Sequence, residues 1–572
     1  MRIESRVLPE QLPDLGDLPP LLTRLYAARG VRSARELDRS LRALLPWNLL
    51  KGIDRAVQVL RQALELRQSI LIVGDFDCDG ATASAVAVLG LRALGAARVD
   101  YLVPNRFEYG YGLTPEIVEV ALQRQPDVLV TVDNGISSVE GVAAARAAGL
   151  RVVVTDHHLP GAQLPEADAI VNPSQPGCDF PSKAIAGVGV IFYVLMALRA
   201  ALREDGWFSP ARPEPNLGEL LDLVALGTVA DVVPLDANNR ILVHQGLARI
   251  RAGRCRPGIR ALLEVARRPA ERLASTDLGF IIGPRLNAAG RLDDMSLGIE
   301  CLLTDDEQAA RDMAGELDSL NRDRKAIEQG MQQQALQMLD SASLQESELP
   351  FGLCLFDPQW HQGVIGILAS RLKERYHRPV IAFADAGDGQ IKGSARSIAG
   401  LHIRDALDSV AAANPGLISK FGGHAMAAGL SLPAAHFEAF CQAFDQEVRR
   451  QLSAEDLTGR LLCDGELAAE EFSLQLAAAL RDAGPWGQHF PEPGFHGEFT
   501  LIQQRLVGER HLKLVLQPNG GTEVLDAIAF NIDPEVWPDP TIRRARLVYS
   551  LDVNEYRGRQ SLQLMVRHLQ AC

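Results

Sequence analysis

Short, almost continuous runs of apolar residues recur through the first part of the chain. Strands that are buried on both faces of a parallel sheet have this pattern, whereas strands with one exposed face alternate apolar and polar residues. Alanine-rich stretches separate the runs and predict helices. The predicted strands are residues 69–73, 99–103, 128–132, 151–155 and 169–171, and the predicted helices are residues 54–67, 81–94, 114–124 and 139–148. This alternation predicts a doubly wound α/β domain with a parallel sheet.

The pattern changes further along the chain. Residues 185–340 are largely helical, and their last part has few helix breakers, which predicts one long connecting helix. A smaller α/β unit follows, and the short strands and turns after it predict a β-barrel or sandwich. The expected segments are residues 1–50 at the N-terminus, 51–304 with the first domain and its helical extension, 305–350 with the connecting helix and a linker, 351–454 with the second domain, and 455–572 with the β domain.

Composition narrows the class of protein. The eight cysteines are scattered without a CxxC pair, which predicts a reducing, cytoplasmic location rather than a disulfide framework or a zinc ribbon. The N-terminus lacks the apolar core of a signal peptide, and the longest apolar run, residues 187–198, is too short to span a bilayer. The formal net charge of −14 argues only weakly against nucleic acid, because a local groove of arginines can still hold a polyanion.

Acidic clusters interrupt the apolar pattern at four places, and they supply the candidate chemistry. They read VGDFDCDG at residues 73–80, TVDNG at 131–135, VTDHH at 154–158 and TVADVVPL at 228–235. We expect them at the carboxyl ends of the strands, where open α/β sheets bind ligands. Buried carboxylates are costly unless positive charge pairs with them, and two divalent cations would satisfy this many. Oxygen and imidazole ligands favour Mn²⁺ or Mg²⁺, and a pair of such ions hydrolyses phosphate esters.

Simpler interpretations explain single residues but not the set. A calcium loop starting at Asp75 would need a glutamate at its twelfth position, where the chain has Val86. Helix capping would explain one aspartate of the first cluster, and it would explain Asp231 equally well if that residue stood alone. The predicted metal ligands are Asp77, Asp79, Asp133, His157 and Asp231, with Asp75 and Asp156 as further candidates. Among the predicted catalytic residues we also count His158, which would orient the site or contact phosphate, and Asp133 would bridge the ions.

Four arginines stand in segments that contain glycine, asparagine or serine, and we expect these segments to be loops. Such loops can present backbone N–H groups and guanidinium groups to phosphates. A single arginine of this kind more often forms a surface salt bridge, but four are harder to explain in that way. The predicted phosphate contacts are Arg106, Arg285, Arg291 and Arg396.

The four acidic motifs, in this order, resemble those of the DHH phosphoesterase superfamily. The resemblance extends from about residue 45 to the end of the chain, and its further motifs are similar to those of the bacterial members specific for single-stranded DNA. It implies a DHH domain, a long helix, a DHHA1 domain and a C-terminal OB-fold. These further motifs are RFEYGYGL at residues 106–113, GFIIGPRLNAAGRL at 279–292, WHQGVIGILASRL at 360–372, KGSARS at 392–397 and FGGHAMAAGL at 421–430.

The resemblance also implies site residues beyond the metal ligands. Ser394 and Arg396, together with the loop Gly422, Gly423 and His424, would hold the terminal phosphate and the nearby backbone. His361 would touch the scissile region. The resemblance adds Asn287 to the substrate contacts predicted above.

The implied activity is metal-dependent 5′→3′ hydrolysis of single-stranded DNA to mononucleotides, in RecF-type recombination and mismatch repair. Single-strand-binding protein and a RecQ-type helicase are the expected partners, and we expect a monomer. Two alternatives stay open at this point. One is a DHH-type phosphodiesterase of oligonucleotides or cyclic dinucleotides, and the other is a single-strand-binding replication scaffold without catalysis.

Overall fold

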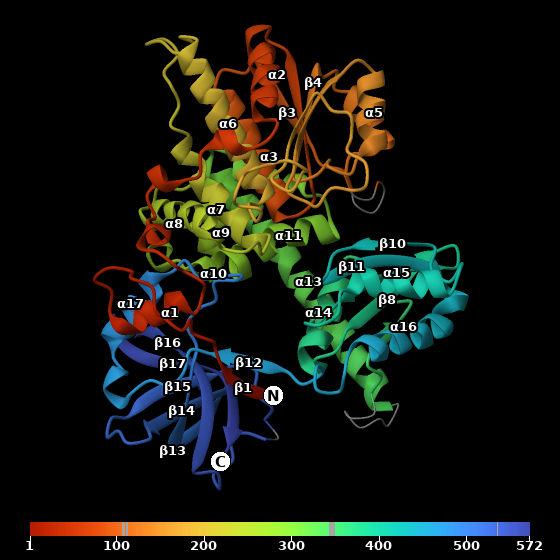
Figure 1. The fold of residues 1–572 in the computed structure, drawn as a ribbon. Coiled ribbons are helices and arrows are strands. Elements are labelled where there is room, and N and C mark those ends of the chain that lie inside the picture. Colours follow the sequence, from red (N-terminus) through yellow and green to blue (C-terminus); the bar gives the residue numbers. More distant parts are fainter. Residues whose placement is uncertain (106–108, 110–111, 342–348, 509, 535, 557) are drawn as a thin grey trace. The chain divides into compact units, whose positions relative to one another are not determined.

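The computed structural model forms two compact units (Figure 1). One contains residues 1–4 and 319–461, and the other contains residues 5–318 and 462–572. The structure describes the whole chain except residues 106–108, 110–111, 342–348, 509, 535 and 557. The predicted boundaries at residues 50, 304, 350 and 454 stay predictions, because each unit joins several of the predicted segments. Among the described helices, none is long and apolar enough to cross a membrane.

A five-stranded parallel sheet forms the core of the larger unit, as the apolar runs predict. The sheet order is β3-β2-β4-β5-β6, so the chain reverses direction across the sheet between β3 and β4. Every residue of β4 is buried, which explains why its sequence, VLVTV, is apolar except for Thr131. The strands are β2 (Ser69–Gly74), β3 (Arg98–Leu102), β4 (Val128–Val132), β5 (Arg151–Thr155) and β6 (Ala169–Val171).

Helices cover both faces of this sheet. On one face, α4 (Pro115–Leu122) and α5 (Val139–Ala147) pack in a single apolar cluster with side chains of β2, β4 and β5. The helices α2 (Ile53–Glu65), α3 (Cys78–Ala93) and α6 (Gly187–Glu204) pack against one another and against the sheet. The helix α3 begins three residues before its predicted start, because the side chain of Asp77 caps it by accepting a hydrogen bond from the Gly80 N–H.

The region after the sheet is helical, as predicted. Its last helix, α13, is continuous over 35 residues and confirms the long connecting helix. A single π-helical turn, η6 (Leu278–Ile282), precedes α11. The helices are α7 (Leu221–Ala230), α8 (Ala237–Arg251), α9 (Pro257–Val265), α10 (Ser275–Asp277), α11 (Gly283–Leu292), α12 (Ser296–Leu303) and α13 (Glu307–Ser341).

The smaller unit contains the second α/β fold. Its sheet has the order β10-β11-β9-β8-β7, in which β7 and β8 are parallel and the other pairs are antiparallel. The strands are β7 (Leu353–Phe356), β8 (Val380–Gly387), β9 (Gln390–Arg396), β10 (Lys420–Gly423) and β11 (Ala427–Pro433), and the helices are α14 (Ile365–Tyr376), α15 (Ile403–Ala413) and α16 (Phe437–Gln451).

Five C-terminal strands close into a barrel in the larger unit, in the order β13-β14-β15-β17-β16. Alternate residues of β14 are buried, which is the pattern expected for a strand with one face toward a barrel interior. The elements are α17 (Leu474–Ala483), β13 (Phe495–Val507), β14 (His511–Pro518), β15 (Leu525–Ala529), β16 (Arg544–Tyr556) and β17 (Arg559–Ala571), and a separate two-stranded sheet joins β1 (Arg2–Ser5) to β12 (Arg460–Cys463).

The N-terminal segment, for which the sequence predicts no chemistry, packs on residues near the other end of the chain. The helix α1 (Pro20–Ala27) carries Tyr26, whose ring stacks on Trp486 and Phe490 with centroids 6.1 Å away in each case. The Tyr26 hydroxyl donates to the Ala483 carbonyl at 2.8 Å, and Arg29 pairs with Asp464 at 2.9 Å. These contacts bury one face of α1 against the segment that leads into the barrel.

Candidate metal centre and phosphate sites

The acidic motifs meet at the carboxyl edge of the parallel sheet. Asp75 follows β2, Asp133 follows β4, and His157 follows β5. Asp79 precedes the predicted helix 81–94 in the sequence analysis, but in the structure it lies in the first turn of α3. Asp231 was expected at a strand end but is the C-cap residue of α7, so a helix end and three strand ends build the site together.

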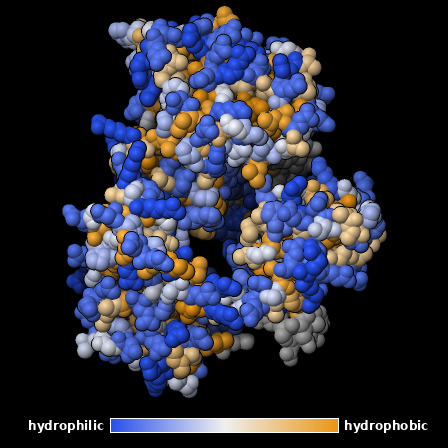
Figure 2. All heavy atoms as spheres, viewed as in Figure 1, coloured by the Kyte–Doolittle hydropathy of each residue, from blue (hydrophilic) through white to orange (hydrophobic). Residues whose placement is uncertain are grey.

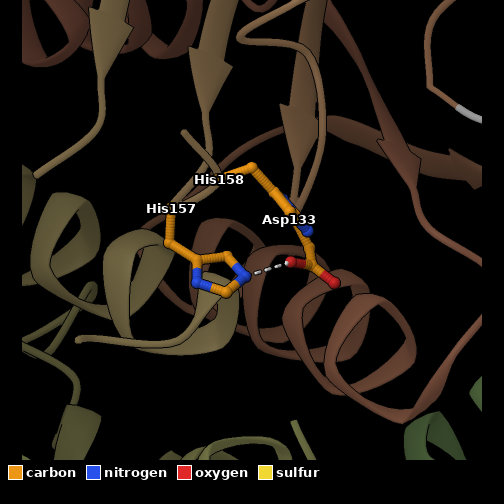
Figure 3. A group of neighbouring side chains, drawn as sticks. All are labelled: Asp133, His157 and His158. Atoms are coloured by element: carbon orange, nitrogen blue, oxygen red, sulfur yellow. Dashed lines mark ion pairs between the residues drawn. The ribbon is translucent and has the colours of Figure 1, made fainter. Parts of the chain in front are cut away.

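The imidazole of His157 points toward the carboxylate of Asp133 (Figure 3). Its Nε2 atom lies 3.1 Å from Asp133 Oδ1 and 3.4 Å from Asp231 Oδ2. Asp79 Oδ2 is 4.0 Å away from the same nitrogen. One imidazole nitrogen therefore faces three carboxylates that come from three separate segments of the chain.

Three groups of described side chains bring their ligand atoms within 4.8 Å of one another. Asp133 belongs to two of the groups and His157 to two, as expected for residues shared by neighbouring ions. Carboxylate oxygens with imidazole nitrogen are a donor set that fits Mn²⁺ or Mg²⁺. The groups are Asp133, His157 and His158; Asp79, His157 and Asp231; and Asp75, Asp77 and Asp133.

The N-terminus of α6 holds Asp79, and sequence reasoning missed this contact. The backbone N–H groups of Gly187 and Val188 donate to the two carboxylate oxygens of Asp79 at 2.6 and 3.0 Å. A methyl group at Gly187 would come within 2.6 Å of Asp133 Cβ and Oδ1. Glycine is therefore required where α6 approaches two of the predicted ligands at once. The motif GVGV at the start of an apolar helix is the only sequence signal for this role.

Asp156 orients the histidine pair. Its Oδ1 accepts hydrogen bonds from the backbone N–H groups of His157 and His158 at 2.7 and 3.1 Å, and it lies 2.7 Å from His158 Nδ1. Its Oδ2 accepts from the Ile136 N–H at 2.9 Å. Asp156 belongs to none of the described groups that could hold an ion, so its geometry suits positioning better than coordination.

The pKa values distinguish Asp156, which positions the histidines, from the carboxylates that are predicted to bind metal. Burial alone would raise the pKa of Asp156, but its bond to the His158 imidazole holds that pKa below the ordinary value. Burial alone would lower the pKa of His158, but Asp156 raises it to about 9. Among the predicted ligands the carboxyl pKa values are raised and not lowered. Burial, and then repulsion from Asp77, raise the pKa of Asp79 to about 7. Burial and repulsion from Asp79 also raise the pKa values of Asp133 and Asp231 well above the ordinary range.

These raised pKa values predict that the metal-free protein becomes less stable as the pH rises. A carboxyl group whose pKa is about 7 when folded and about 3.9 when unfolded binds its proton more tightly in the folded state. Its contribution is therefore lost progressively between about pH 4 and pH 7. We expect the melting temperature in EDTA to fall from pH 5 to pH 8, and to fall less in Asp79→Asn. Thermal unfolding at several pH values measures this, and equal slopes for both proteins would contradict it.

The predicted substrate residues of the larger unit lie on a helix, not in loops. Arg285, Asn287 and Arg291 all belong to α11. Asn287 Oδ1 accepts a hydrogen bond from the Cys78 N–H at 2.8 Å, which ties α11 to the first acidic motif. Arg285 donates to the Ile281 carbonyl and pairs with Asp318 at 2.8 Å. Arg106 lies outside the described residues, and substrate contact by these residues stays a prediction.

The predicted phosphate residues of the smaller unit lie together on its sheet. Arg396 is at the end of β9 and donates to Ser394 Oγ at 3.1 Å, and burial lowers the pKa of its guanidinium group. A methyl group at Gly366, in the first turn of α14, would come within 2.9 Å of both side chains. The start of α14 and the end of β9 therefore form one compact corner.

The other predicted residues of this unit lie on β10 and before α14. Gly422 and Gly423 end β10, and His424 follows them and donates its backbone N–H to the Ala427 carbonyl at 2.8 Å. Gly423 has φ +146, and a methyl group there would come within 2.4 Å of the Ala428 Cα. His361 Nδ1 accepts from the Gly363 N–H at 3.1 Å in the turn before α14. The structure does not test whether these groups bind phosphate.

Comparison with known proteins places this arrangement in a family. The DHH family, N-terminal domain, matches residues 69–228, the DHHA1 domain matches residues 349–450, and the RecJ OB domain matches residues 463–568. The single-stranded-DNA-specific exonuclease RecJ of Dickeya dadantii is 61% identical over 560 residues, which are 98% of this chain and 97% of that protein. The chain belongs to the RecJ family. RecJ of Escherichia coli is 58% identical over 570 residues, which cover 100% of this chain and 99% of that protein.

Solved RecJ structures share the fold. RecJ of Thermus thermophilus in complex with Mn²⁺ superposes with a TM-score of 0.82 at 32% identity and covers 100% of this chain and 80% of that one. The same RecJ in complex with Mg²⁺ gives a TM-score of 0.77 at 30% identity, with 100% and 78% covered. The DHH, DHHA1 and OB domains implied by the motifs are therefore confirmed.

Proposed function

We propose that this chain is a metal-dependent exonuclease that degrades single-stranded DNA from the 5′ end to mononucleotides. The observation that carries the proposal is the cluster of carboxylates and imidazoles at the edge of the DHH sheet. Relatives that match it over nearly their whole length are single-stranded-DNA-specific exonucleases, and related structures contain Mn²⁺ or Mg²⁺. The fold and the side-chain chemistry thus support the same activity.

Each residue of the cluster has a definable task. Two divalent cations, when bound, activate water and stabilise the charge on the scissile phosphate. Asp156 fixes the turn that presents His157, and the N-terminus of α6 fixes Asp79. Asp133, held with φ +62 at the end of β4, shares one group with the first acidic motif and another with the histidine pair. The proposed ligands are Asp77, Asp79, Asp133, His157 and Asp231, with Asp75 able to complete one group.

The decisive experiment follows a long single strand that carries a label at one end. With Mn²⁺, a 5′-labelled strand should release labelled mononucleotide at once, whereas a 3′-labelled strand should shorten gradually. A blunt duplex of the same sequence should stay intact. Cleavage restricted to dinucleotides or cyclic dinucleotides would instead identify a small-substrate phosphodiesterase. Binding without cleavage would identify a scaffold.

The biological setting belongs to the same proposal. The chain acts as a cytoplasmic monomer in RecF-type recombination and mismatch repair. Single-strand-binding protein and a RecQ-type helicase supply its substrate. Support comes from the substrate class of its relatives, because a single-strand exonuclease needs another activity to open duplex DNA.

Arg396 is proposed to bind the 5′ phosphate. Arg396→Ala should weaken binding of 5′-phosphorylated single strands roughly ten- to hundredfold, because a charged hydrogen bond contributes about 1.5–3 kcal/mol. Binding of 5′-hydroxyl strands should change much less. Fluorescence anisotropy with both strands in EDTA measures the difference.

Lys392→Ala is the matched control for Arg396→Ala. Lys392 is an exposed cation on the same strand, β9, so the control removes one positive charge without altering the corner beside α14. It should affect both strands equally. Equal losses for the two strands in Arg396→Ala as well would show that Arg396 is a general backbone contact.

A further inference from the structure

Phe280 is an exposed aromatic residue on a turn whose other residues are buried or half-buried. Its side chain is 81% accessible, whereas Leu278 and Ile282 on the same π-helical turn are fully buried. The visible face of the molecule is largely hydrophilic, with apolar residues scattered over it (Figure 2). A single exposed apolar residue needs no explanation by itself. Phe280 gains significance because its turn packs against the end of α7, which leads into the proposed ligand Asp231.

The turn that carries Phe280 is held rigidly. The Gly283 N–H donates to the Leu278 carbonyl and closes the π turn. Arg285 donates to the Ile281 carbonyl and is itself held by Asp318. Turns of this type occur frequently at functional sites. The phenyl ring is therefore displayed on a fixed support and not on a loose loop.

This turn lies directly against the end of α7, the helix that leads into Asp231. A methyl group at Gly279 would come within 3.2 Å of Val229 Cγ1, and one at Gly283 within 3.2 Å of Ala230 Cβ. The next residues are Asp231 and then Val232, which is 61% exposed and has φ +62. A β-branched residue is rarely found at positive φ, and such strain concentrates at functional sites.

We propose that Phe280, on the turn that packs against the end of α7, stacks on a nucleobase of the single strand whose phosphate lies at the metal centre. The inference rests on the proposed function. An aromatic ring recognises every base by its face and reads no sequence, which suits an enzyme that must degrade any strand. The faces of bases in a duplex are covered by their neighbours. Stacking on Phe280 therefore favours single strands.

The test compares Phe280→Ala with Phe280→Trp on 5′-phosphorylated oligonucleotides that carry one abasic residue at each position in turn. On the intact strand, Phe280→Ala should lower kcat/KM about 5- to 100-fold, and Phe280→Trp should stay close to the wild type. At one position the abasic residue should slow the wild type by a similar factor and should not slow Phe280→Ala further.

A second measurement does not need catalysis. With 2-aminopurine placed at each position in turn, strand binding in EDTA should change the fluorescence at one position for the wild type and for Phe280→Trp, but not for Phe280→Ala. Leu66→Ala is the matched control, because Leu66 is 61% exposed and lies just before β2, at the opposite edge of the sheet. It should leave all readouts unchanged.

Two outcomes would overturn the inference, and a third would refute the proposed activity instead. Unchanged kinetics in Phe280→Ala would remove any role in binding. Equal slowing on intact strands and on every abasic strand would make Phe280 a packing residue. A wild type that binds strands without cutting them would refute the exonuclease instead, and the 2-aminopurine signal would still decide the stacking contact.

Discussion

Asp133→Asn should reduce hydrolysis of single-stranded DNA by at least about 100-fold. Loss of a residue that only supports metal ligands already costs roughly 10- to 100-fold, and Asp133 belongs to two of the candidate ligand groups. The substitution keeps the size of the side chain and removes a carboxylate whose pKa burial and neighbouring aspartates raise. The metal-free variant should therefore be at least as stable as the wild type at pH 8. Initial rates in Mn²⁺ and thermal unfolding in EDTA measure the two effects.

Asp127→Asn is the control for Asp133→Asn. Asp127 precedes β4, at the opposite edge of the sheet, and its Oδ2 accepts a hydrogen bond from the Ser69 N–H at 2.7 Å. An amide oxygen can accept the same bond, so this variant should keep both activity and stability. Near-normal turnover by Asp133→Asn would refute the proposed ligand set. A similar loss in the control would point to general damage to the sheet.

Gly187→Ala should cost the enzyme roughly 100-fold in kcat although it removes no ligand. The added methyl group would lie 2.6 Å from Asp133 Cβ, so either Asp133 or the N-terminus of α6 must move. Moving α6 would also break the bonds that hold Asp79. Small misplacements of reacting groups can cost this much. The measurement is kcat together with the Mn²⁺ concentration for half-maximal rate, which should rise.

Gly189→Ala separates this effect from damage to the helix. Gly189 lies two residues further along α6, and a methyl group there would come within 2.5 Å of Cγ1 of Ile185, a buried residue that is not a predicted ligand. Both variants crowd the same helix, but only the first crowds a predicted ligand. We expect similar losses of stability and a much smaller loss of activity for Gly189→Ala. Equal activities would show that α6 does not position the metal centre.

The strands and many of the site residues could be predicted because each strand, and the acidic motif at its end, is recognisable in a short stretch of sequence. A short run of mostly β-branched residues such as β4 favours a buried strand, and the residue after such a strand lies at the carboxyl edge of a parallel sheet. Asp75, Asp133 and His157 are placed by this rule alone. The rule gives no distance between them, which depends on the packing of α3 and α6.

The parts that could not be predicted depend on contacts between distant segments. Glycine, proline and asparagine in GPRLNAAGRL suggested a loop, but Pro284 occupies the first turn of α11, where proline is tolerated. Gly290 is there for close packing, since a methyl group would come within 1.9 Å of the Phe76 carbonyl oxygen. Likewise nothing near Asp231 in the sequence reveals that the end of α7 reaches His157. Local signals cannot distinguish a glycine in a turn from one at a helix contact.

The stacking of Tyr26 on Trp486 and Phe490 has a consequence for synthesis of the chain. Contacts of the same region join residues that are far apart in the sequence. Tyr26 is 457 residues before Ala483, to which it donates a hydrogen bond, and Arg29 is 435 residues before Asp464, with which it forms an ion pair. At roughly 5–20 residues per second, the ribosome needs on the order of 20–90 s to make the second partner after the first. During this time the apolar face of α1 stays without its native cover. The segment made first can therefore complete its native contacts only after almost the whole chain has been made.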